Sequence, residues 1–560
     1  MLAMCVAHED KLTSVAYSFG VTFIAVAIPV ARTDAVSRAL ESAQAAKLHG
    51  ADLVEWRVDT LAEDSHGSSA IVRLVQESPL PCIVTVRDES EGGAFSGSDD
   101  ERIAVWRAAS KAVPPPAYID VELSTYHARD SMGNSAREIA RISNMEKTDA
   151  PRVILSFHDF RGRPPGLSSR VAEMWSDPGS AIAKVVWTAR TARDNIEAFE
   201  LLASRAKPTI ALCMGEHGLM SRVLAPKFGG FLTYARADDH GTAPGQPTVE
   251  ELVHNWGFRS IDQSTKVFGV IAYPVSHSRS PEIHNRWFRA ANFNARLFAI
   301  AVAPSWEPFK ATLAELFGYA PLDFCGVAVS MPHKENAIRF VKEFGGVIEQ
   351  SAQRIGAANT IGKSADGKLF ARNTDADGVV ESLANAMRRA GGDGDLRGKR
   401  IAILGAGGAA RAAAFGVGSR GASVVITNRT ASKAKKIAEE FARALGDAPA
   451  LDVKAKALSA LSKERFDVII NCTSVGMDGG PAAGQNPLPA EVVLDEHVVV
   501  MDAVYAPAKT ALLLHAEQCG AKCVGGWEML IAQAAHQFEG WTGKRPLVGA
   551  DPSADAAPSR

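Results

Sequence analysis

The sequence predicts an α/β protein in which a (β/α)₈ TIM barrel is followed by a second α/β module with a Rossmann-like nucleotide-binding domain. Eight short apolar runs alternate with helix-compatible segments over the first 255 residues, which is the profile of such a barrel. Near residue 401, an apolar run, a glycine-rich turn and a second apolar run indicate a βαβ nucleotide-binding unit. A chain of 560 residues is also too long for a single core.

The eight apolar runs of the first half are the strands expected for the barrel. Each has the length of a buried parallel strand, and segments between them, such as 34–49 and 194–204, are rich in Ala, Arg and Glu, as helices are. A doubly wound sheet is the structural alternative, but it would not need eight such units. The expected strands are Phe23–Pro29, Leu53–Arg57, Cys82–Arg87, Tyr118–Glu122, Val153–His158, Ala181–Trp187, Thr209–Met214 and Phe231–Tyr234.

Polar side chains stand near the C-terminal ends of these runs, where such barrels carry their active sites. Lys184 lies within the sixth run, and His158 ends the fifth. The convergence of several polar residues on one face predicts a site there. The others are Glu55 and Arg57 in the second run, Arg87 at the end of the third, Glu122 near the end of the fourth and Met214 at the end of the seventh.

Lys184 has only apolar neighbours between Ala181 and Trp187. Inside a barrel its ammonium would lose hydration, which lowers the pKa and frees the amine as a nucleophile. A neutral amine attacks a ketone and forms a Schiff base, an electron sink for proton removal at the neighbouring carbon. His158, on the adjacent strand, is a candidate general acid and base. Alternatively, Lys184 reaches solvent or pairs with a carboxylate, and His158 is a hydrogen-bonded histidine at a strand end.

The βαβ unit also indicates which nucleotide it binds. Its glycine-rich turn would bring backbone N–H groups close to a pyrophosphate at a helix N-terminus, although Ala410 replaces the last glycine of the strict pattern. After the second strand an NAD enzyme usually has Asp or Glu, whereas this chain has cations, which suit the 2′-phosphate of NADP. The strands are Ile401–Leu404 and Ser423–Thr427, and the expected contacts are Gly405, Ala406, Gly407, Gly408, Ala409, Asn428, Arg429, Thr430 and Lys433.

The composition argues against several other classes of protein. A net charge of −2 gives no reason to expect nucleic acid or a membrane as partner, and no apolar run reaches the ~18 residues of a membrane span. Seven cysteines without a C-x-x-C pattern indicate a reducing compartment and no metal site. Residues 1–18 lack a signal-peptide core, so we expect a cytoplasmic protein, with a plastid as the alternative. The polar tail after Val548 is expected to be disordered.

A set of short motifs runs through the first half in order. They are Glu55-Trp56-Arg57-Val58-Asp59, Thr85-Val86-Arg87 with Glu91-Gly92-Gly93, Ser156-Phe157-His158-Asp159-Phe160, Lys184, Met220-Ser221-Arg222 and Ala243-Pro244-Gly245-Gln246. Together they resemble type I 3-dehydroquinate dehydratase. The resemblance implies that Lys184 forms an imine with the substrate ketone. It also implies that His158 moves protons in imine formation, α-proton abstraction and loss of water.

The same resemblance implies the substrate contacts of the barrel. Arg222 is the implied partner of the substrate carboxylate, which a guanidinium can bind through two hydrogen bonds. Glu91 orients either His158 or the substrate. The remaining contacts are Glu55, Arg57, Arg87, Gln246 and Thr242, which stands where the family often has Ser. A structural ion pair between Glu55 and Arg57 is the alternative for those two residues.

A second set of motifs follows the polar stretch 257–266, in which we place the domain link. They are Val275–Pro281 (VSHSRSP), Val329–Lys334 (VSMPHK), Gly356–Thr360 (GAANT), Arg372–Gly378 (RNTDADG), Asn471–Met477 (NCTSVGM), Asp502–Tyr505 (DAVY) and Gly525–Gln533 (GGWEMLIAQ). From Val267 to about Pro546 the chain resembles shikimate dehydrogenase, a two-lobed module that binds NADP. The expected domains are therefore 20–256, a substrate lobe at 265–390 and an NADP lobe with a closing helix at 396–548.

By this resemblance, Lys334 and Asp375 form the coupled pair that protonates the developing alkoxide, with Asn359 beside them. Ser278 and Ser280 bind the substrate carboxylate. The other implied contacts are Ser330, Tyr505 and Gln533 to the substrate, and Thr473, Gly526 and Met529 near the nicotinamide. The alternatives are a plain salt bridge for the Lys–Asp pair, a turn and helix cap for the serines, and an ordinary core position for Met529.

Together the two resemblances imply a bifunctional enzyme of the shikimate pathway. The first site would dehydrate 3-dehydroquinate to 3-dehydroshikimate without a metal, and the second would reduce that product to shikimate with NADPH. Ser330-Met331 replace the Thr and Val or Ile usual in the family, so a quinate/shikimate dehydrogenase of relaxed specificity is an alternative. A sensor that has lost turnover and, for the barrel, a Schiff-base aldolase are others. Only small-molecule partners are expected, and the oligomeric state stays open.

Overall fold

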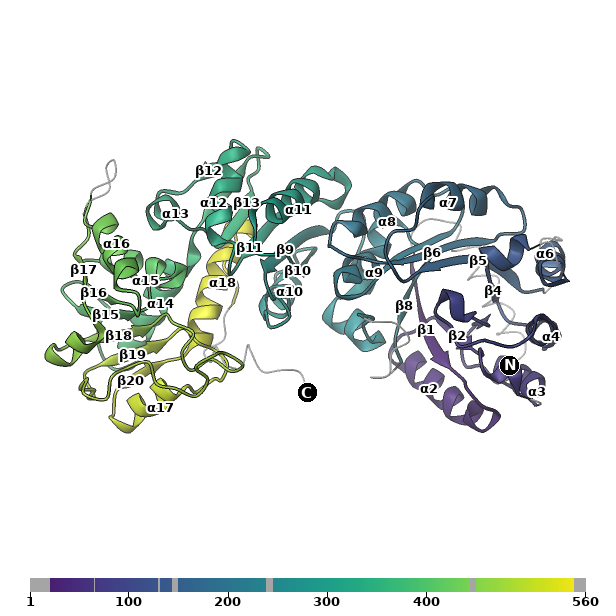
Figure 1. Cartoon of the computed structure of the whole chain (residues 1–560), viewed down its shortest axis with the longest axis horizontal. Coiled ribbons are helices and arrows are strands. Elements are labelled where there is room, and N and C mark those ends of the chain that lie inside the picture. The colour runs from purple at the N-terminus through teal and green to yellow at the C-terminus, as the bar shows by residue number, and fades with distance from the viewer. Residues whose placement is uncertain are drawn as a thin grey trace. The chain divides into compact units, whose positions relative to one another are not determined.

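The computed structural model describes residues 21–64, 66–128, 131–143, 150–237, 245–443 and 450–547 (Figure 1). The chain divides into two compact units, residues 1–265 and 266–560, and the division falls within the polar stretch 257–266. The N-terminal segment and the C-terminal tail, for which the sequence predicted no signal peptide and disorder respectively, lie outside the described residues. In the ranges described, no helix has the length and apolar character needed to cross a bilayer.

The first unit is a parallel sheet rolled into a nearly closed barrel, which confirms the predicted fold. The strand order is β7-β6-β5-β4-β3-β2-β1-β8, so each strand pairs with its neighbour in the chain and β8 pairs with β1. A 2.9 Å backbone hydrogen bond from Phe231 N to Thr209 O joins the start of β8 to β7. The strands are β1 (Phe23–Pro29), β2 (Leu53–Arg57), β3 (Cys82–Thr85), β4 (Tyr118–Glu122), β5 (Arg152–Asp159), β6 (Ile182–Thr188), β7 (Thr209–Met214) and β8 (Leu232–Ala235).

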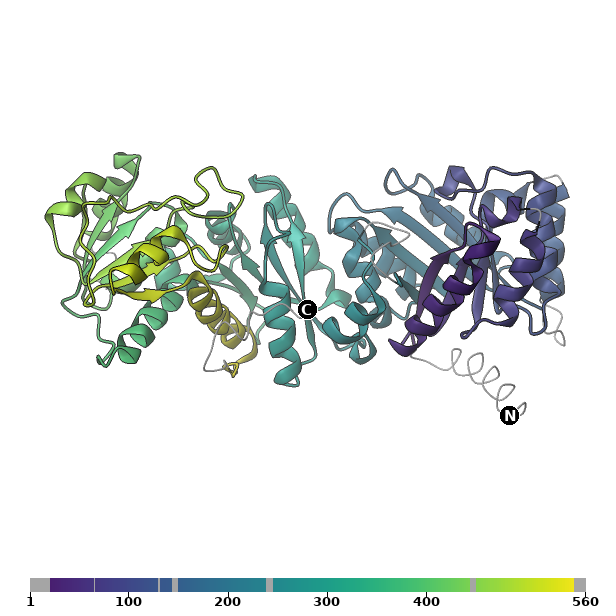
Figure 2. The ribbon, with the colours of Figure 1, turned by 90° about the horizontal axis from the view of Figure 1, so that it is seen from below.

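Helices lie around the outside of these strands (Figures 1 and 2). Their buried residues recur every three or four positions, as in Gly67, Ala70 and Leu74, so each helix turns one apolar face towards the sheet. The third of them, α4, begins at a capping box formed by Ser98 and Glu101. The helices are α2 (Val36–Leu48), α3 (Gly67–Gln76), α4 (Asp99–Ser110), α5 (Leu123–His127), α6 (Ser131–Ser143), α7 (Leu167–Ser176), α8 (Asp194–Ala203) and α9 (Leu219–Val223).

The barrel interior has an apolar layer and, nearer the C-terminal ends of the strands, a polar layer. Because alternate residues of a strand share one face, a polar side chain follows an apolar core residue two positions later on several strands. The site therefore sits on a packed apolar floor. The pairs are Ile83 and Thr85 on β3, Ile154 and Ser156 on β5, and Ile182 and Lys184 on β6.

The second unit has two lobes, each built on a six-stranded sheet. The N-terminal lobe has the order β10-β9-β11-β13-β14-β12, with β13 antiparallel to both of its neighbours. Its strands are β9 (Lys266–Ala272), β10 (Ala295–Ala301), β11 (Phe324–Val329), β12 (Val347–Ile348), β13 (Thr360–Lys363) and β14 (Leu369–Arg372). Its helices are α10 (Ser280–Ala290), α11 (Trp306–Gly318), α12 (Lys334–Glu343) and α13 (Gln350–Ile355).

The C-terminal lobe is a doubly wound parallel sheet of order β17-β16-β15-β18-β19-β20, the strand order of a Rossmann fold. The predicted βαβ unit is its centre. Its strands are β15 (Arg400–Leu404), β16 (Ser423–Thr427), β17 (Val453–Ala455), β18 (Val468–Asn471), β19 (Val499–Asp502) and β20 (Lys522–Val524). Its helices are α15 (Gly408–Gly418), α16 (Ala431–Phe441) and α17 (Ala511–Gln518).

Two long helices cross between the lobes and pack against each other, α14 (Thr374–Arg389) and α18 (Gly526–Thr542). Although α14 follows the last strand of the N-terminal lobe, Val379 and Leu383 belong to the core of the C-terminal lobe. Conversely, α18 follows the last strand of the C-terminal lobe, yet Ala534 and Phe538 belong to the core of the N-terminal lobe. Each lobe is thus completed by a helix from the other side of the sequence.

Candidate active sites

The polar layer of the barrel surrounds the amine of Lys184, which is 3% exposed. Its Nζ donates hydrogen bonds to Asp120 Oδ2 at 2.9 Å, to the Tyr234 hydroxyl at 3.1 Å and to Glu55 Oε1 at 3.4 Å. An ammonium has three N–H donors, so each of them has an acceptor here.

The charge of Lys184 differs from the expectation drawn from the sequence. Burial alone would lower its pKa, but Asp120 and Glu55 outweigh burial, so the pKa is raised above its usual value. The prediction of a lowered pKa is therefore wrong for the free protein, in which Lys184 is an ammonium. The alternative, in which Lys184 pairs with a carboxylate, is observed, and the carboxylates of Asp120 and Glu55 lie inside the barrel with it. One proton must leave before the amine can attack a ketone.

A buried network of charges holds Asp120 beside this amine. Arg87 Nη2 donates to Asp120 Oδ1 at 2.6 Å, and Arg87 Nη1 lies 3.2 Å from Glu122 Oε1. Glu122 also pairs with Arg102 of α4. All four side chains are at most 3% exposed. A buried charge without its partner is energetically costly, so each member of the network stays in contact with the others. The network therefore fixes the position of Asp120.

His158 and Glu91 form a second pair in the same layer. Glu91 Oε2 accepts from His158 N at 3.1 Å and lies 3.2 Å from His158 Nδ1. Burial, assisted by Arg87 and Lys184, lowers the His158 pKa well below its usual value, so the imidazole is neutral. Burial also raises the pKa of Glu91 to about 7, against the attraction of Arg87. A neutral imidazole that donates through Nδ1 to Glu91 keeps Nε2 free to accept a proton.

Glu55 and Arg57 do not form the ion pair considered as an alternative. Arg57 Nη2 pairs with Asp59 Oδ2 at 2.7 Å, and Glu55 Oε1 accepts from Thr85 Oγ1 at 2.7 Å and from Lys184. Glu55 therefore belongs to the lysine site.

Arg222 is a buried cation without a carboxylate partner in the described ranges. It lies on α9, is 2% exposed, and its Nε has no hydrogen-bond acceptor. Burial lowers its pKa to about 10. An uncompensated buried guanidinium is unfavourable, and a bound anion would relieve that cost. Gln246 is also buried, whereas Thr242 lies outside the described residues.

The second unit brings four predicted residues together at the start of α14. Lys334, the first residue of α12, pairs with Asp375 Oδ2. Asn359 Nδ2 donates to Asp375 Oδ1 at 2.9 Å and to Gln533 Oε1 of α18 at 3.1 Å. Asn359 Oδ1 accepts from Thr374 N at 2.8 Å. The amide thus orients both the carboxylate and the glutamine, and the lysine faces the other carboxylate oxygen.

The predicted substrate serines lie near one another on the N-terminal lobe. Ser280 begins α10, is 7% exposed, and its N–H donates to Ser278 Oγ at 3.4 Å. Tyr505 approaches the same loop, since its hydroxyl donates to His277 O at 3.5 Å. Ser330 follows β11 and is exposed, and its N–H donates to Ile271 O at 2.8 Å. The hydroxyl of Ser330 is therefore accessible.

The glycine-rich turn fits a dinucleotide pyrophosphate. Gly405 has φ +117°, and a Cβ there would lie 2.9 Å from Cys472 O, so the turn requires glycine. A Cβ at Gly407 would meet nothing within 4 Å, so its backbone is open to a ligand at the start of α15. Ala406, Gly408 and Ala409 are partly exposed around it.

The cations after β16 are placed for a 2′-phosphate. Arg429 and Lys433 are both exposed, and neither forms an ion pair with a residue that the structure describes. Asn428 Nδ2 donates to Thr430 O at 3.1 Å and fixes the intervening turn. Two unpaired cations beside the turn fit NADP better than NAD.

The residues predicted near the nicotinamide have mixed environments. The hydroxyl of Thr473 is used within its own loop, at 2.7 Å from Asn471 Oδ1. A Cβ at Gly526 would lie 2.4 Å from Val504 O, so only glycine fits there. Met529 is 7% exposed and belongs to the core of the C-terminal lobe, as its alternative interpretation predicts.

Comparison with known proteins covers both units. The chain matches family models described as type I 3-dehydroquinase (residues 24–263), shikimate dehydrogenase substrate binding domain (270–361), shikimate/quinate 5-dehydrogenase (386–476) and shikimate 5′-dehydrogenase C-terminal domain (526–550). It is 35% identical over 537 residues to the chloroplastic bifunctional 3-dehydroquinate dehydratase/shikimate dehydrogenase of Arabidopsis thaliana, covering 92% of this chain and 82% of the relative. The chain belongs to this bifunctional family.

Relatives of the dehydrogenase half alone are also found. The shikimate dehydrogenase (NADP(+)) of Methanocaldococcus jannaschii is 38% identical over 288 residues, covering 51% of this chain and 95% of that protein. A structure of Thermus thermophilus shikimate 5-dehydrogenase with NADP(H) and shikimate is 33% identical, covers 52% of this chain and 97% of that chain, and has a TM-score of 0.43. The curated relatives named here are shikimate rather than quinate dehydrogenases, so the quinate alternative is not favoured.

Three residues of the dehydratase site were not predicted from the sequence. Asp120 could have been found, because it stands two residues before Glu122 on a strand in which alternate residues share a face. Tyr234 ends an expected strand, but its hydroxyl gave no signal of its own. Arg102 lies within a helix and could not be assigned to Glu122 from the sequence.

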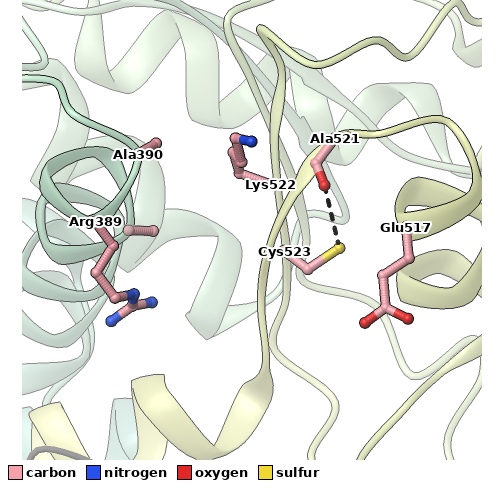
Figure 3. A pocket seen from close by; sticks show the side chains of 7 residues that line it. Arg389, Ala390, Glu517, Ala521, Lys522 and Cys523 are labelled. Carbon is pink, nitrogen blue, oxygen red and sulfur yellow. Dashed lines mark hydrogen bonds between the residues drawn. The ribbon is translucent and has the colours of Figure 1, made fainter.

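A pocket of about 300 Å³ opens at the far end of α14 (Figure 3). It lies between that helix, α17 and β20, and none of its lining residues belongs to the family motifs. The residues that line the pocket are Ala386, Arg389, Ala390, Glu517, Ala521, Lys522 and Cys523.

Within the described ranges, no three His, Cys, Asp or Glu side chains come together as a metal site.

Proposed function

We propose that the first unit dehydrates 3-dehydroquinate to 3-dehydroshikimate through an imine on Lys184, and that the second reduces 3-dehydroshikimate to shikimate. The observation that supports this most directly is that the same barrel contains a buried lysine amine and a buried Arg222, which has no carboxylate partner among the described residues. A 3-dehydroquinate molecule carries both a ketone for the amine and a carboxylate for the guanidinium.

In the dehydratase, each charged group has a separate task. Arg222 binds the carboxylate and thereby places the ketone towards Lys184. After losing a proton, Lys184 attacks the ketone carbon, and loss of water gives the imine. His158 Nε2 then removes the proton from the carbon next to the imine, and the same histidine protonates the departing β-hydroxyl. Glu91 holds His158 and stabilises the imidazolium formed between these two transfers.

The imine supplies the electrophilic activation, so this route needs no metal. Asp120 and Arg87 lie on the same layer, where they keep the lysine nitrogen fixed through the steps. The apolar layer of the barrel interior excludes water from the side of the site that faces the N-terminal ends of the strands. Glu55, Arg57 and Gln246 complete the wall that contacts the substrate hydroxyls, with Thr242 as a further predicted contact.

In the dehydrogenase, Ser278 and Ser280 hold the substrate carboxylate, and Ser330, Tyr505 and Gln533 border the ring. Lys334 and Asp375 protonate the oxygen of the ketone as it is reduced, with the proton shared within the pair before delivery. Asn359 keeps the carboxylate of Asp375 in place.

NADPH, when bound, supplies the hydride for this reduction. The turn from Gly405 to Ala409 would hold its pyrophosphate, and Asn428, Arg429, Thr430 and Lys433 its 2′-phosphate. Thr473, Gly526 and Met529 would border the nicotinamide. The partners required are therefore small molecules. The cytoplasmic location remains a prediction, with the plastid as its alternative, and cell fractionation would decide between them.

Borohydride trapping tests the first activity. The full chain is incubated with 3-dehydroquinate, reduced, digested and mapped by mass spectrometry. We expect a reduced adduct on Lys184, because borohydride converts an imine into a stable secondary amine. Dehydration without any adduct would mean a different elimination chemistry. The absence of both the adduct and turnover would exclude the dehydratase assignment.

Lys184→Ala provides the matched variant. It should abolish dehydration and trapping while NADPH-dependent reduction of 3-dehydroshikimate, measured on the same sample at 340 nm, stays unchanged. Loss of both activities would contradict two independent sites.

A further inference from the structure

The Lys184 amine has two contacts that the family motifs do not include, the carboxylate of Asp120 and the hydroxyl of Tyr234. Tyr234 lies on β8, which β7 separates from β6, and is 6% exposed. Its hydroxyl is 3.1 Å from Lys184 Nζ, and the same nitrogen lies 4.5 Å from the centre of its ring. The other two contacts of the nitrogen are carboxylates.

The three contacts are unequal, and this decides which proton of the ammonium is lost. Asp120 at 2.9 Å and Tyr234 at 3.1 Å hold two of the N–H groups closely, whereas Glu55 at 3.4 Å holds the third more loosely. Asp120 accepts from the cation of Arg87 and from Ser156, whereas Glu55 accepts from the neutral hydroxyl of Thr85, so Asp120 is the weaker base. The proton directed at Glu55 is therefore the one to leave.

We propose that Tyr234 is a positioning residue for imine formation, whose hydroxyl keeps one N–H of Lys184 bound while the proton facing Glu55 is lost. In that step the N–H bond towards Glu55 breaks, an O–H bond forms on the Glu55 carboxylate, and the nitrogen keeps its electron pair. Asp120 and Tyr234 retain the two remaining N–H groups. The lone pair then points towards Glu55, on the side of the predicted substrate wall.

A neutral acceptor suits this role better than a third carboxylate. Asp120 and Glu55 already raise the pKa of Lys184, and a further anion would make the neutral amine still harder to reach. Burial and the same carboxylates raise the pKa of Tyr234 too, so its hydroxyl stays protonated and uncharged. The tyrosine therefore holds the nitrogen without adding charge.

The test is Tyr234→Phe in the full chain, which keeps the ring and removes only the hydroxyl. We expect kcat for dehydration to fall roughly 10- to 100-fold, the effect of losing one hydrogen bond to a charged group, while KM for 3-dehydroquinate changes less than about threefold. Reduction of 3-dehydroshikimate by the same chain should be unchanged, which verifies folding of the second unit, whereas the near-parental KM for 3-dehydroquinate reports a folded barrel. A kcat within about threefold of the parent would overturn the proposal.

A matched control and a graded variant separate positioning from packing. Tyr126→Phe removes another buried barrel phenol, whose hydroxyl donates to Asp177 at 3.0 Å, and should leave kcat unchanged. Replacing Tyr234 by 3-fluorotyrosine weakens the oxygen as an acceptor with almost no change in size, so kcat should take an intermediate value and the pH profile of kcat should shift. Parent-like kcat and pH profile in the fluorinated protein would show that the hydroxyl only packs.

This inference rests on the imine role proposed for Lys184, and the two can fail separately. If borohydride traps Lys184 in the parent at the same rate as in Tyr234→Phe, the role of Tyr234 fails while the imine stands. If the parent dehydrates without any adduct on Lys184, both fail, and the proposed function is the cause.

Discussion

Replacing Arg222 by Met should stabilise the barrel and impair its substrate binding at the same time. Burial lowers the pKa of Arg222 from its usual 12.5 to about 10. At about 1.4 kcal/mol for each factor of ten, the buried charge costs the fold roughly 3 kcal/mol. Because the folded-state pKa lies below the unfolded one, this cost is present at every pH below about 10, and so at pH 7.

The opposite effect on binding follows from the same charge. If the substrate carboxylate is the missing partner, removing the guanidinium loses a buried charged hydrogen bond, and KM for 3-dehydroquinate should rise roughly 100-fold. The methionine side chain fills much of the space that the arginine occupied, so a large cavity is not created.

Hydrogen exchange of the full chain, followed by mass spectrometry, measures the stability effect. Peptides from β6 and β7 should exchange more slowly in Arg222→Met, whereas peptides from the second unit serve as an internal reference. Arg102→Met is the matched contrast. Arg102 is equally buried but paired with Glu122, so its loss should destabilise the barrel by about 3–5 kcal/mol. Faster exchange with an unchanged KM in Arg222→Met would refute the reasoning.

Three further predictions concern the other charged groups. Arg429→Asp should weaken NADP binding about 10- to 100-fold and spare NAD, as measured by titration of both cofactors; an unchanged preference would mean that the 2′-phosphate lies elsewhere. The folded-state pKa of Glu91 is raised to about 7, above its usual 4.5, so its contribution to stability is present below pH 4.5 and is lost as the pH rises through 7. Glu91→Gln should remove that dependence, so that urea midpoints of variant and parent differ more at pH 8 than at pH 5; a constant difference would contradict the raised pKa. Asp375→Asn should lower kcat for reduction by a factor of about 100 or more and leave dehydration intact, as followed by NADPH absorbance, whereas a change confined to KM would make the Lys334–Asp375 pair a structural salt bridge.

The barrel strands and the positions of its polar residues could be predicted because local pattern determines them. The bounds of β1, β2, β4 and β7 match the predicted runs, since a buried strand is a short apolar segment between polar ones. His158 and Lys184 lie on the neighbouring strands β5 and β6, as their positions in two consecutive runs indicated.

The charge of Lys184 could not be predicted in the same way. Its immediate neighbours in sequence are apolar, and from these alone a lowered pKa follows. Its neighbours in space are Asp120 and Glu55, which come from β4 and β2, and only closure of the barrel brings them to the amine. Burial and Coulomb attraction act in opposite directions here, and their balance depends on distances that no sequence spacing encodes.

The exchange of α14 and α18 between the two lobes of the second unit makes proton delivery sensitive to the angle between the lobes. Lys334 belongs to the N-terminal lobe, and Asn359 holds Asp375 to the same lobe, whereas the middle of α14 is anchored by Val379 and Leu383 in the other lobe. A rotation of one lobe would therefore be transmitted along α14 to the end of the helix that carries Asp375. A mutation in the interior of α14 would slow turnover without weakening binding, so the enzyme would lose rate at a distance from both of its ligands.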